Sequence, residues 1–224
     1  MKMVECVLFD MDGVLIDSEK IILEAAIKGL RVFGVNAEPE DFLPYVGAGE
    51  DRYIGCVAQK YGTKFVPEMK SVVYDIYADI IKKHPETVYP GVKEVIEKVK
   101  SKYKCAVCSA ADYTKVCHNL NAIGVTQSFF DAVVSGSDVK RQKPFPDVFL
   151  KGAEKCGVEP AKCLAIDDSL NGIRAAVAAG GVSAGITTMF SKQEILKTVK
   201  PDFIVEDIRE LPALIETVNS NLSM

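Results

Sequence analysis

Two aspartates follow the first apolar run of the chain. Residues 4–9 are rich in apolar side chains and lead directly into Asp10 and Asp12. If this run is a strand of an open α/β sheet, both carboxylates lie near its carboxyl end, where such sheets bind ligands. Two carboxylates this close can share a site if a cation offsets their repulsion. The alternative is an ordinary turn in which the aspartates act as caps.

Three further polar features also follow apolar runs that we expect to be strands. Taken singly, each has an ordinary explanation: a serine in a turn, a lysine in a solvated loop, and aspartates that cap a helix. Together they place a hydroxyl, an ammonium and more carboxylates along one edge of one sheet, which capping alone does not explain. The residues are Ser109 after residues 105–108, Lys143 beyond residues 132–134, and Asp167 and Asp168 after residues 163–166.

These groups are the parts of a site for phosphoryl transfer. Mg²⁺ prefers oxygen ligands, so Asp10 and Asp168 could bind it, and the metal would relieve their repulsion. Lys143 and the Ser109 hydroxyl could hold the phosphoryl oxygens as charge develops on them. One carboxylate could then be the nucleophile. Asp12 could protonate the leaving oxygen and later activate water.

Short apolar runs alternate with helical patterns over most of the chain. This alternation predicts βαβ units and a doubly wound, Rossmann-like α/β core with a parallel sheet. The expected strands span residues 4–9, 105–108, 132–134, 163–166, 182–186 and 203–205. The expected helices of this core span residues 92–100, 113–122, 147–156, 170–179 and 208–218.

The alternation is interrupted between the first and second strands. No strand pattern occurs there, and a structureless loop of that length would be unusual inside a compact domain. We therefore expect an all-helical cap domain over residues 17–85, inserted into a catalytic core of residues 1–16 and 86–224. Ser18 is the expected N-cap of its first helix. The expected cap helices span residues 21–33, 50–61 and 67–82.

Composition excludes several other classes of protein. The 224 residues are 48% hydrophobic, which is typical of a globular chain. No apolar run reaches the roughly 18–20 residues of a membrane span. The net charge of −4 argues against broad binding to nucleic acid. Seven irregularly spaced cysteines fit reduced thiols, and the N-terminus lacks a signal-peptide core, so we expect a cytoplasmic protein.

With these segments in this order, the sequence resembles the haloacid dehalogenase-like hydrolase superfamily, specifically phosphatases with a helical cap inserted after the first motif. The resemblance covers nearly the whole chain and implies the fold described above. The matching segments are residues 10–18 (Asp-Met-Asp-Gly-Val-Leu-Ile-Asp-Ser), Ser109, Lys143-Pro144 and Asp167-Asp168-Ser169.

The resemblance implies a role for each acidic residue. Asp10 would be the nucleophile that becomes phosphorylated, and Asp12 the general acid and base. Mg²⁺ would be held by the Asp10 carboxylate, the Asp12 backbone carbonyl and Asp168. Asp167 would bind the metal directly or through water.

The resemblance also implies where the substrate binds. Ser109, Ala110 and Lys143 would hold the phosphoryl group, and Gly47 and Arg52 would contribute from the cap. Arg52 could reach across a closed cap to the substrate, or it could be a solvated helix residue paired with acidic neighbours. The implied partner is a small phosphorylated metabolite. We expect the protein to be a monomer.

Within the superfamily, the sequence is most similar to the branch of β-phosphoglucomutases and sugar-phosphate phosphatases. Ile22 stands where the mutases carry a histidine, and Val46 and Asp112 stand where they carry lysines. Because those basic contacts serve a bisphosphate intermediate, the resemblance favours a Mg²⁺-dependent phosphatase acting on a sugar phosphate through an aspartyl-phosphate. A hexose-phosphate mutase is the alternative. A phosphonatase would need a cap lysine, and neither Lys20 nor Lys28 has a recognisable context.

A receiver domain that only accepts a phosphoryl group is a different alternative. Receivers also combine acidic residues, a hydroxyl and a lysine at the edge of a parallel sheet. Their acidic pair comes first and their phospho-acceptor sits on a later strand, whereas here the order is reversed. They also have no helical insert, so order and length both count against this alternative.

Overall fold

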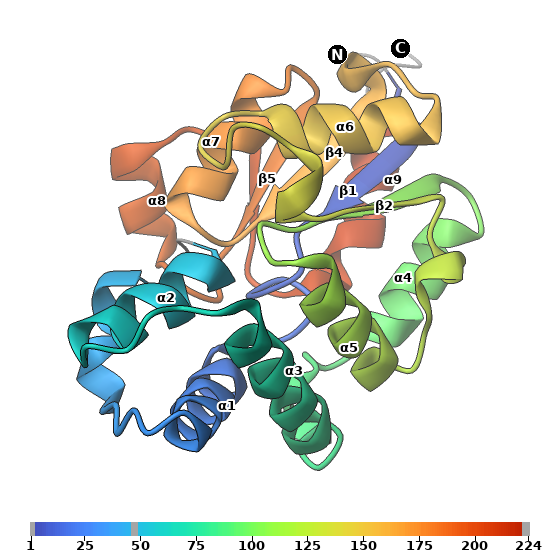
Figure 1. The fold of residues 1–224 in the computed structure, drawn as a ribbon. Coiled ribbons are helices and arrows are strands. Elements are labelled where there is room, and N and C mark those ends of the chain that lie inside the picture. The colour runs from blue at the N-terminus through green and yellow to red at the C-terminus, as the bar shows by residue number, and fades with distance from the viewer. Residues whose placement is uncertain (1–2, 46–48, 221–224) are drawn as a thin grey trace.

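One six-stranded parallel sheet forms the centre of the protein. The computed structural model describes residues 3–45 and 49–220 (Figure 1). The strand order is β3-β2-β1-β4-β5-β6, so the chain reverses direction across the sheet at β1. In α/β sheets this reversal marks the ligand-binding crevice. The strands are β1 (Cys6–Phe9), β2 (Lys104–Cys108), β3 (Ala132–Val134), β4 (Cys163–Asp167), β5 (Val182–Ile186) and β6 (Phe203–Val205).

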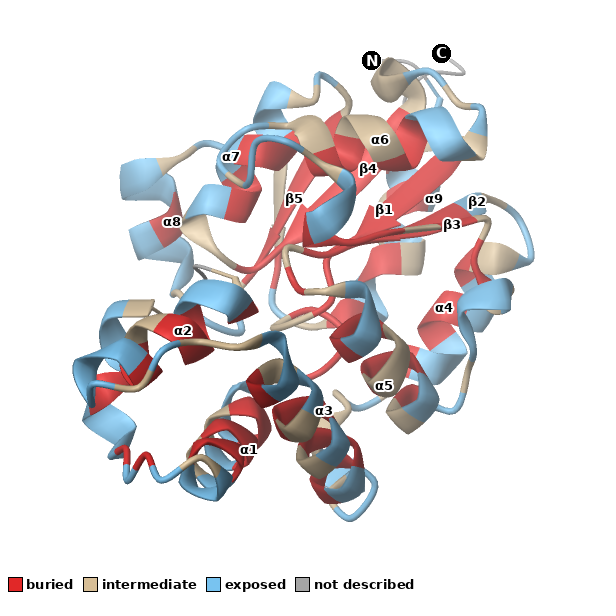
Figure 2. Ribbon diagram, viewed as in Figure 1, coloured by how far each residue is buried: buried red, intermediate tan, exposed pale blue. Residues whose placement is uncertain are grey.

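Helices cover both faces of the sheet, which confirms the predicted doubly wound α/β class. On one face, α6 and α7 pack against small and apolar strand residues, and their buried residues face the sheet (Figure 2). The opposite face packs against α4, α5 and α9. None of the described helices is long and apolar enough to cross a membrane. The core helices are α4 (Val92–Lys100), α5 (Tyr113–Ile123), α6 (Asp147–Cys156), α7 (Leu170–Ala178), α8 (Lys192–Thr198) and α9 (Leu211–Ser220).

Two core helices differ from the sequence-based expectation. The predicted helix over residues 208–218 begins as a 3-10 turn and continues as α9. Helix α8 was not predicted, because only Ile195 of its seven residues is buried and no apolar period reveals it. Its start is nevertheless encoded locally. Ser191 and Glu194 form a capping box, in which each side chain accepts a hydrogen bond from the backbone of the other.

The segment between β1 and α4 folds as a helical insert, defined here by α1 (Glu19–Val32), α2 (Glu50–Lys60) and α3 (Pro67–Ile81). Helices α1 and α3 pack closely, and a Cβ added at Gly29 would lie 2.5 Å from Cγ2 of Val73. The two connections to the core run side by side, because Asp17 donates its backbone N–H to the carbonyl of Thr87 at 2.8 Å. The insert is therefore joined to the core by two adjacent, hydrogen-bonded segments near the end of β1.

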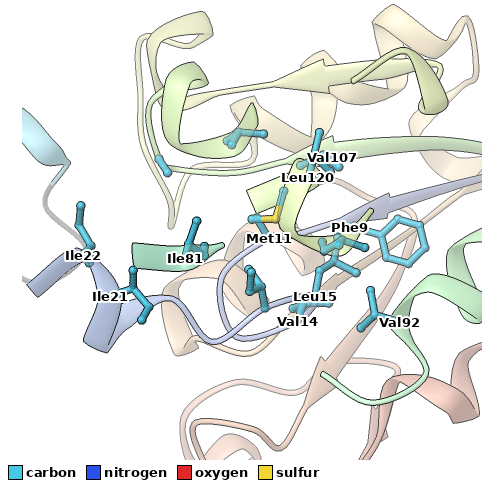
Figure 3. Close-up of a cluster of buried hydrophobic side chains, with 14 of the residues drawn as sticks. Phe9, Met11, Val14, Leu15, Ile21, Ile22, Ile81, Val92, Val107 and Leu120 are labelled. Carbon is cyan, nitrogen blue, oxygen red and sulfur yellow. The ribbon is translucent and has the colours of Figure 1, made fainter. Parts of the chain in front are cut away.

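One hydrophobic cluster continues from the sheet into the insert. Figure 3 shows Phe9 and Val107 of the sheet at one side of this cluster and Ile22 of α1 at the other. Met11 lies between the two aspartates in sequence and is fully buried in the cluster. Packing of Met11 therefore anchors the backbone that carries both carboxylates.

Candidate active site

Three neighbouring strands bring the predicted residues to one edge of the sheet. Phe9 of β1 lies in register with Val107 of β2 and Ile166 of β4. The residues that follow these positions must therefore emerge together. Asp10, which follows Phe9, donates its backbone N–H to the carbonyl of Ile166 at 3.0 Å, which fixes it beside β4.

Lys143 joins two of the carboxylates. Its Nζ lies 2.5 Å from Oδ1 of Asp10 and 2.7 Å from Oδ2 of Asp167. The side chains of all three residues are at most 10% exposed. Burial opposes the charged form of Lys143, but Asp10 and Asp167 outweigh it, so the pKa of Lys143 is raised. The ammonium is thus held charged at the floor of the site.

Asp168 completes a cluster of three buried carboxylates. Ligand oxygens of Asp10, Asp167 and Asp168 all lie within 4.8 Å of one another. Burial, reinforced by Asp167, raises the pKa of Asp10 to about 7 and that of Asp168 to about 8. Lys143 supplies one positive charge against three carboxylates, so the cluster needs further positive charge. An all-oxygen donor set with this excess charge fits a hard divalent cation such as Mg²⁺.

Asp167 lies deeper than its neighbour and is fully buried. Besides Lys143, it accepts hydrogen bonds from the backbone N–H and the hydroxyl of Ser169, at 3.0 and 2.9 Å. Ser169 in turn caps α7 by accepting from the backbone N–H of Gly172 at 3.0 Å. The start of α7 therefore orients Asp167 toward Lys143.

Asp12 is held by different partners from the other aspartates. Its Oδ1 accepts from the hydroxyl of Ser18 and from Nδ2 of Asn119 at 3.2 Å, and its Oδ2 accepts from Nζ of Lys115 at 2.9 Å. Its carboxylate is not part of the three-carboxylate cluster. The predicted metal contact of this residue runs through its backbone carbonyl, which the side-chain geometry does not test.

Ser18 occupies the predicted N-cap position of α1, but its hydroxyl is used elsewhere. Ser18 does precede α1, but its side chain makes no capping hydrogen bond. Its backbone has φ −105° and ψ 0° instead of the extended conformation usual at an N-cap. The hydroxyl instead donates to Oδ1 of Asp12.

Ser109 and Ala110 form the wall of the site at the end of β2. Ser109 is buried, and its hydroxyl accepts the backbone N–H of Ala111 at 3.0 Å. This hydrogen bond closes a local turn, which is the ordinary explanation that the sequence left open for Ser109. Both residues line the same pocket as Asp10 and Lys143.

A pocket of ≈ 620 Å³ lies between the core and the helical insert. Its floor includes Asp10, Lys143 and Asp168. Of the predicted insert residues, Gly47 lies outside the described residues, and Arg52 is an exposed residue of α2 that is not among the residues lining the pocket. The insert lines the pocket with Asp17, Glu19, Ile22, Tyr45, Gly49, Glu50 and Tyr53.

Three buried polar residues near the pocket were not predicted from the sequence: Lys115, Asn119 and Glu50. Lys115 and Asn119 are polar but buried on α5, one turn apart. Two long polar residues spaced i, i+4 beside an apolar helix face were the available signal. Glu50, the first residue of α2, is buried, and burial raises its pKa.

The insert is bound to the core next to Ser109. The carboxylate of Asp112 lies 2.7 Å from Nζ of Lys70 and accepts the hydroxyl of Tyr74 at 2.9 Å, both from α3. Its backbone N–H donates to Glu50 of α2 at 3.2 Å. Burial would raise the pKa of Asp112, but the hydrogen bond from Lys70 and the other contacts outweigh it and lower the pKa. A carboxylate at this position thus joins the two parts of the chain.

Comparison with known proteins agrees with this geometry. The haloacid dehalogenase-like hydrolase family matches residues 7–186. Over 92% of its length, the chain is 39% identical to the chloroplastic protein SUPPRESSOR OF QUENCHING 1 of Arabidopsis thaliana, but it spans only 20% of that protein. Over 96% of its length, it is 25% identical to pyrophosphatase PpaX of Bacillus cereus (strain AH820), covering 98% of that protein.

Solved structures share the fold. A putative β-phosphoglucomutase from Thermotoga maritima has a TM-score of 0.73 at 26% identity, with 96% of this chain and 100% of that chain covered. CbbY from Rhodobacter sphaeroides, solved in complex with phosphate, has a TM-score of 0.78 at 23% identity, with 93% and 96% covered. The family match spans most of the sheet and every residue of the three-carboxylate cluster. The chain therefore belongs to the haloacid dehalogenase-like hydrolase family.

Proposed function

We propose that this protein is a Mg²⁺-dependent phosphatase that hydrolyses a small phosphorylated metabolite, a sugar phosphate, through a phosphorylated Asp10. The observation that supports it most directly is the position of Lys143. Its ammonium bridges Asp10 and Asp167 at the floor of a pocket, beside Asp168. This arrangement concentrates positive charge next to one carboxylate that faces the pocket, as a nucleophile attacking a phosphate ester requires.

The proposed reaction has two displacements at phosphorus. In the first, an oxygen of Asp10 bonds to phosphorus, the ester bond breaks, and the leaving oxygen takes a proton from Asp12. In the second, water gives a proton to Asp12 and bonds to phosphorus, and the bond to Asp10 breaks. Lys143 and Ser109 hold the phosphoryl oxygens throughout. Mg²⁺, held by Asp10, Asp168 and the Asp12 carbonyl, would supply the positive charge that the carboxylate cluster needs.

The wall of the pocket supports a substrate with hydroxyl groups rather than a second phosphate. The described insert residues that line it include the carboxylates of Glu19 and Glu50 and the phenol of Tyr53, and no lysine or arginine. Carboxylates accept hydrogen bonds from hydroxyls and repel a second phosphate. Besides Lys143, the core adds Arg174 and Lys115 to the lining, and Lys115 is paired with Asp12. The insert wall favours a phosphatase over the alternative, a hexose-phosphate mutase that must hold a bisphosphate.

We extend the proposal to the protein's surroundings. We expect a monomer in the cytoplasm that binds neither nucleic acid nor membranes. All seven cysteines are free thiols, which suits a reducing compartment. Size-exclusion chromatography with light scattering tests the oligomeric state directly.

The deciding experiment measures phosphate release from a panel of phosphorylated metabolites, including sugar phosphates and pyrophosphate. Turnover should require Mg²⁺, stop with EDTA and be lost in Asp10→Asn, while Asp75→Asn on an exposed part of the insert should match the wild type. Turnover that survives Asp10→Asn would exclude the aspartyl-phosphate. With β-glucose 1-phosphate and catalytic bisphosphate, glucose 6-phosphate accumulating instead of free phosphate would favour the mutase.

A further inference from the structure

Both carboxylate oxygens of Asp12 are held by one face of α5. Lys115 donates to Oδ2 at 2.9 Å, and Asn119 donates to Oδ1 at 3.2 Å. The two donors are four residues apart, so they lie one above the other on the same face of the helix. A carboxylate held at both oxygens cannot rotate about its Cβ–Cγ bond without breaking a contact.

The two donors are themselves fixed. The side chain of Lys115 is 5% exposed, against 21% for Asp12. Burial opposes its positive charge, but Asp12, Tyr77 and Glu50 outweigh this effect, and the pKa of Lys115 is raised. A buried ammonium that lost Asp12 would be left uncompensated, so the pair resists separation.

Asn119 is oriented from the helical insert. It is fully buried, and the hydroxyl of Tyr77 on α3 donates to its Oδ1. With the amide oxygen occupied in this way, the NH₂ group is directed at Asp12. A chain of contacts thus runs from the insert through α5 to the carboxylate.

We infer that Lys115 and Asn119 are positioning residues, which fix the Asp12 carboxylate in the orientation from which it gives its proton to the leaving oxygen and later takes one from water. This inference rests on the proposed function, because it assigns Asp12 that task. Lys115 also lines the pocket, but the role inferred here comes from its contact with Asp12 and requires no contact with the substrate. Their effect comes from geometry, since a displacement of about 1 Å at a reacting group can slow a reaction about 100-fold.

Leaving-group dependence separates positioning from other roles. An alkyl phosphate such as a sugar phosphate releases an alkoxide that needs the proton from Asp12, whereas p-nitrophenol is acidic enough to leave without it. In Lys115→Met, we expect kcat/KM to fall at least about tenfold more for the sugar phosphate than for p-nitrophenyl phosphate. Because water activation also slows, p-nitrophenol should appear in a burst of about one equivalent per enzyme.

Two further variants keep the test informative if Lys115→Met folds poorly. Asn119→Leu removes one donor, and Tyr77→Phe removes only the hydroxyl that orients Asn119; each should shift the leaving-group ratio in the same direction, Tyr77→Phe least. Lys100→Met is the matched control, because it breaks a core ion pair with Asp131 away from the pocket. It should lower stability without changing the ratio or producing a burst.

The outcomes also separate this inference from the proposed function. Suppose that the wild type turns over both substrates and that Asp12→Asn is impaired. Equal losses of kcat/KM on both substrates in all three variants would then overturn the positioning role alone. A rise in KM with kcat unchanged would also overturn it, since it would indicate direct substrate binding. A wild type without phosphatase activity, or with activity that survives Asp10→Asn, would overturn both.

Discussion

Gly13 lies directly against the carboxylate of Asp168. A Cβ added at Gly13 would overlap the Asp168 side chain, closer than real Cβ atoms approach any neighbour. Gly13 also has φ +80°, a conformation that side chains other than glycine rarely adopt. Two independent constraints therefore require glycine at the turn that follows Asp12, and one of them depends on Asp168, the residue directly after β4.

Gly13→Ala should therefore damage the site as well as the turn. The new methyl group must push the Asp168 carboxylate away from Asp10 and Asp167. We expect Mg²⁺-dependent phosphatase activity to fall at least about 100-fold, by the sensitivity of such sites to displacements of about 1 Å. The stabilisation of the protein by Mg²⁺, measured as a shift in Tm, should disappear.

Gly34→Ala is the matched control for the backbone. Gly34 follows α1 with φ +77°, close to that of Gly13, but no atom of a described residue beyond its chain neighbours lies within 4 Å of its added Cβ. This substitution should lower the free energy of unfolding by about 1–2 kcal/mol through the left-handed backbone alone. Activity and the Mg²⁺ response should remain. Equal behaviour of the two variants would show that the contact with Asp168 is unimportant.

The sheet and the carboxylate cluster were predictable from the sequence because topology alone decides them. Once residues 4–9 and 163–166 are parallel strands, their carboxyl ends must meet, whatever the detailed packing. Asp10 and Asp167 then come together without any knowledge of side-chain conformation. The position of Lys143 could not be predicted from topology alone, because this residue lies on a loop. It was predicted only because a lysine completes the set of carboxylates and hydroxyl at the same edge of the sheet.

The surroundings of Asp12 were not predictable in the same way. Lys115 is 103 residues away from Asp12 in sequence, and the sequence around a buried helix lysine does not indicate its partner. The sequence also could not show whether the Ser18 hydroxyl caps α1 or donates to Asp12, because the backbone angles of Ser18 decide between these two contacts. Side-chain direction at the junction of the two parts of the chain, rather than fold, limited what the sequence could show.

Lys143→Met should destabilise the metal-free protein. It leaves Asp10 and Asp167 buried without their counter-charge, and breaking a buried ion pair typically costs roughly 3–5 kcal/mol. The loss, measured by urea unfolding in EDTA, should be smaller at pH 5 than at pH 8, because Asp10, with a pKa of about 7, is then protonated. Lys102→Met, which removes an exposed lysine paired with the exposed Glu216, should change little. Equal losses in both variants would contradict the role of Lys143.

Ionisation of Asp168 should destabilise the metal-free fold as pH rises. Its pKa is about 8 in the folded protein, against an ordinary value of 3.8 for an aspartate, so between these pH values the folded state binds more protons than the unfolded chain. Stability therefore falls as pH rises through this range. In EDTA, Asp168→Asn should raise Tm at pH 8 by several degrees, since about 1 kcal/mol is worth roughly 2–4 °C at this size.

The same measurement at pH 5 supplies the control for Asp168→Asn. There the wild-type carboxyl is already protonated, so the two proteins should differ little in Tm. Adding Mg²⁺ at pH 8 should raise the Tm of the wild type and not that of the variant. A variant that is less stable than the wild type at pH 8 in EDTA would show that burial of this carboxylate carries no such penalty.

Ser18 and Ser191 both precede helices, and their replacement by alanine should have opposite consequences. Ser191 accepts the backbone N–H of Glu194 at 3.3 Å and caps α8, so Ser191→Ala should lower the free energy of unfolding by about 0.5–2 kcal/mol and leave activity intact. Ser18 makes no capping bond but donates to Asp12, so Ser18→Ala should lower kcat about tenfold or more. Unfolding curves and kinetics on the same preparations check both. If Ser18→Ala lost stability and kept kcat, its hydroxyl would serve α1 after all, and the contact with Asp12 would have no part in turnover.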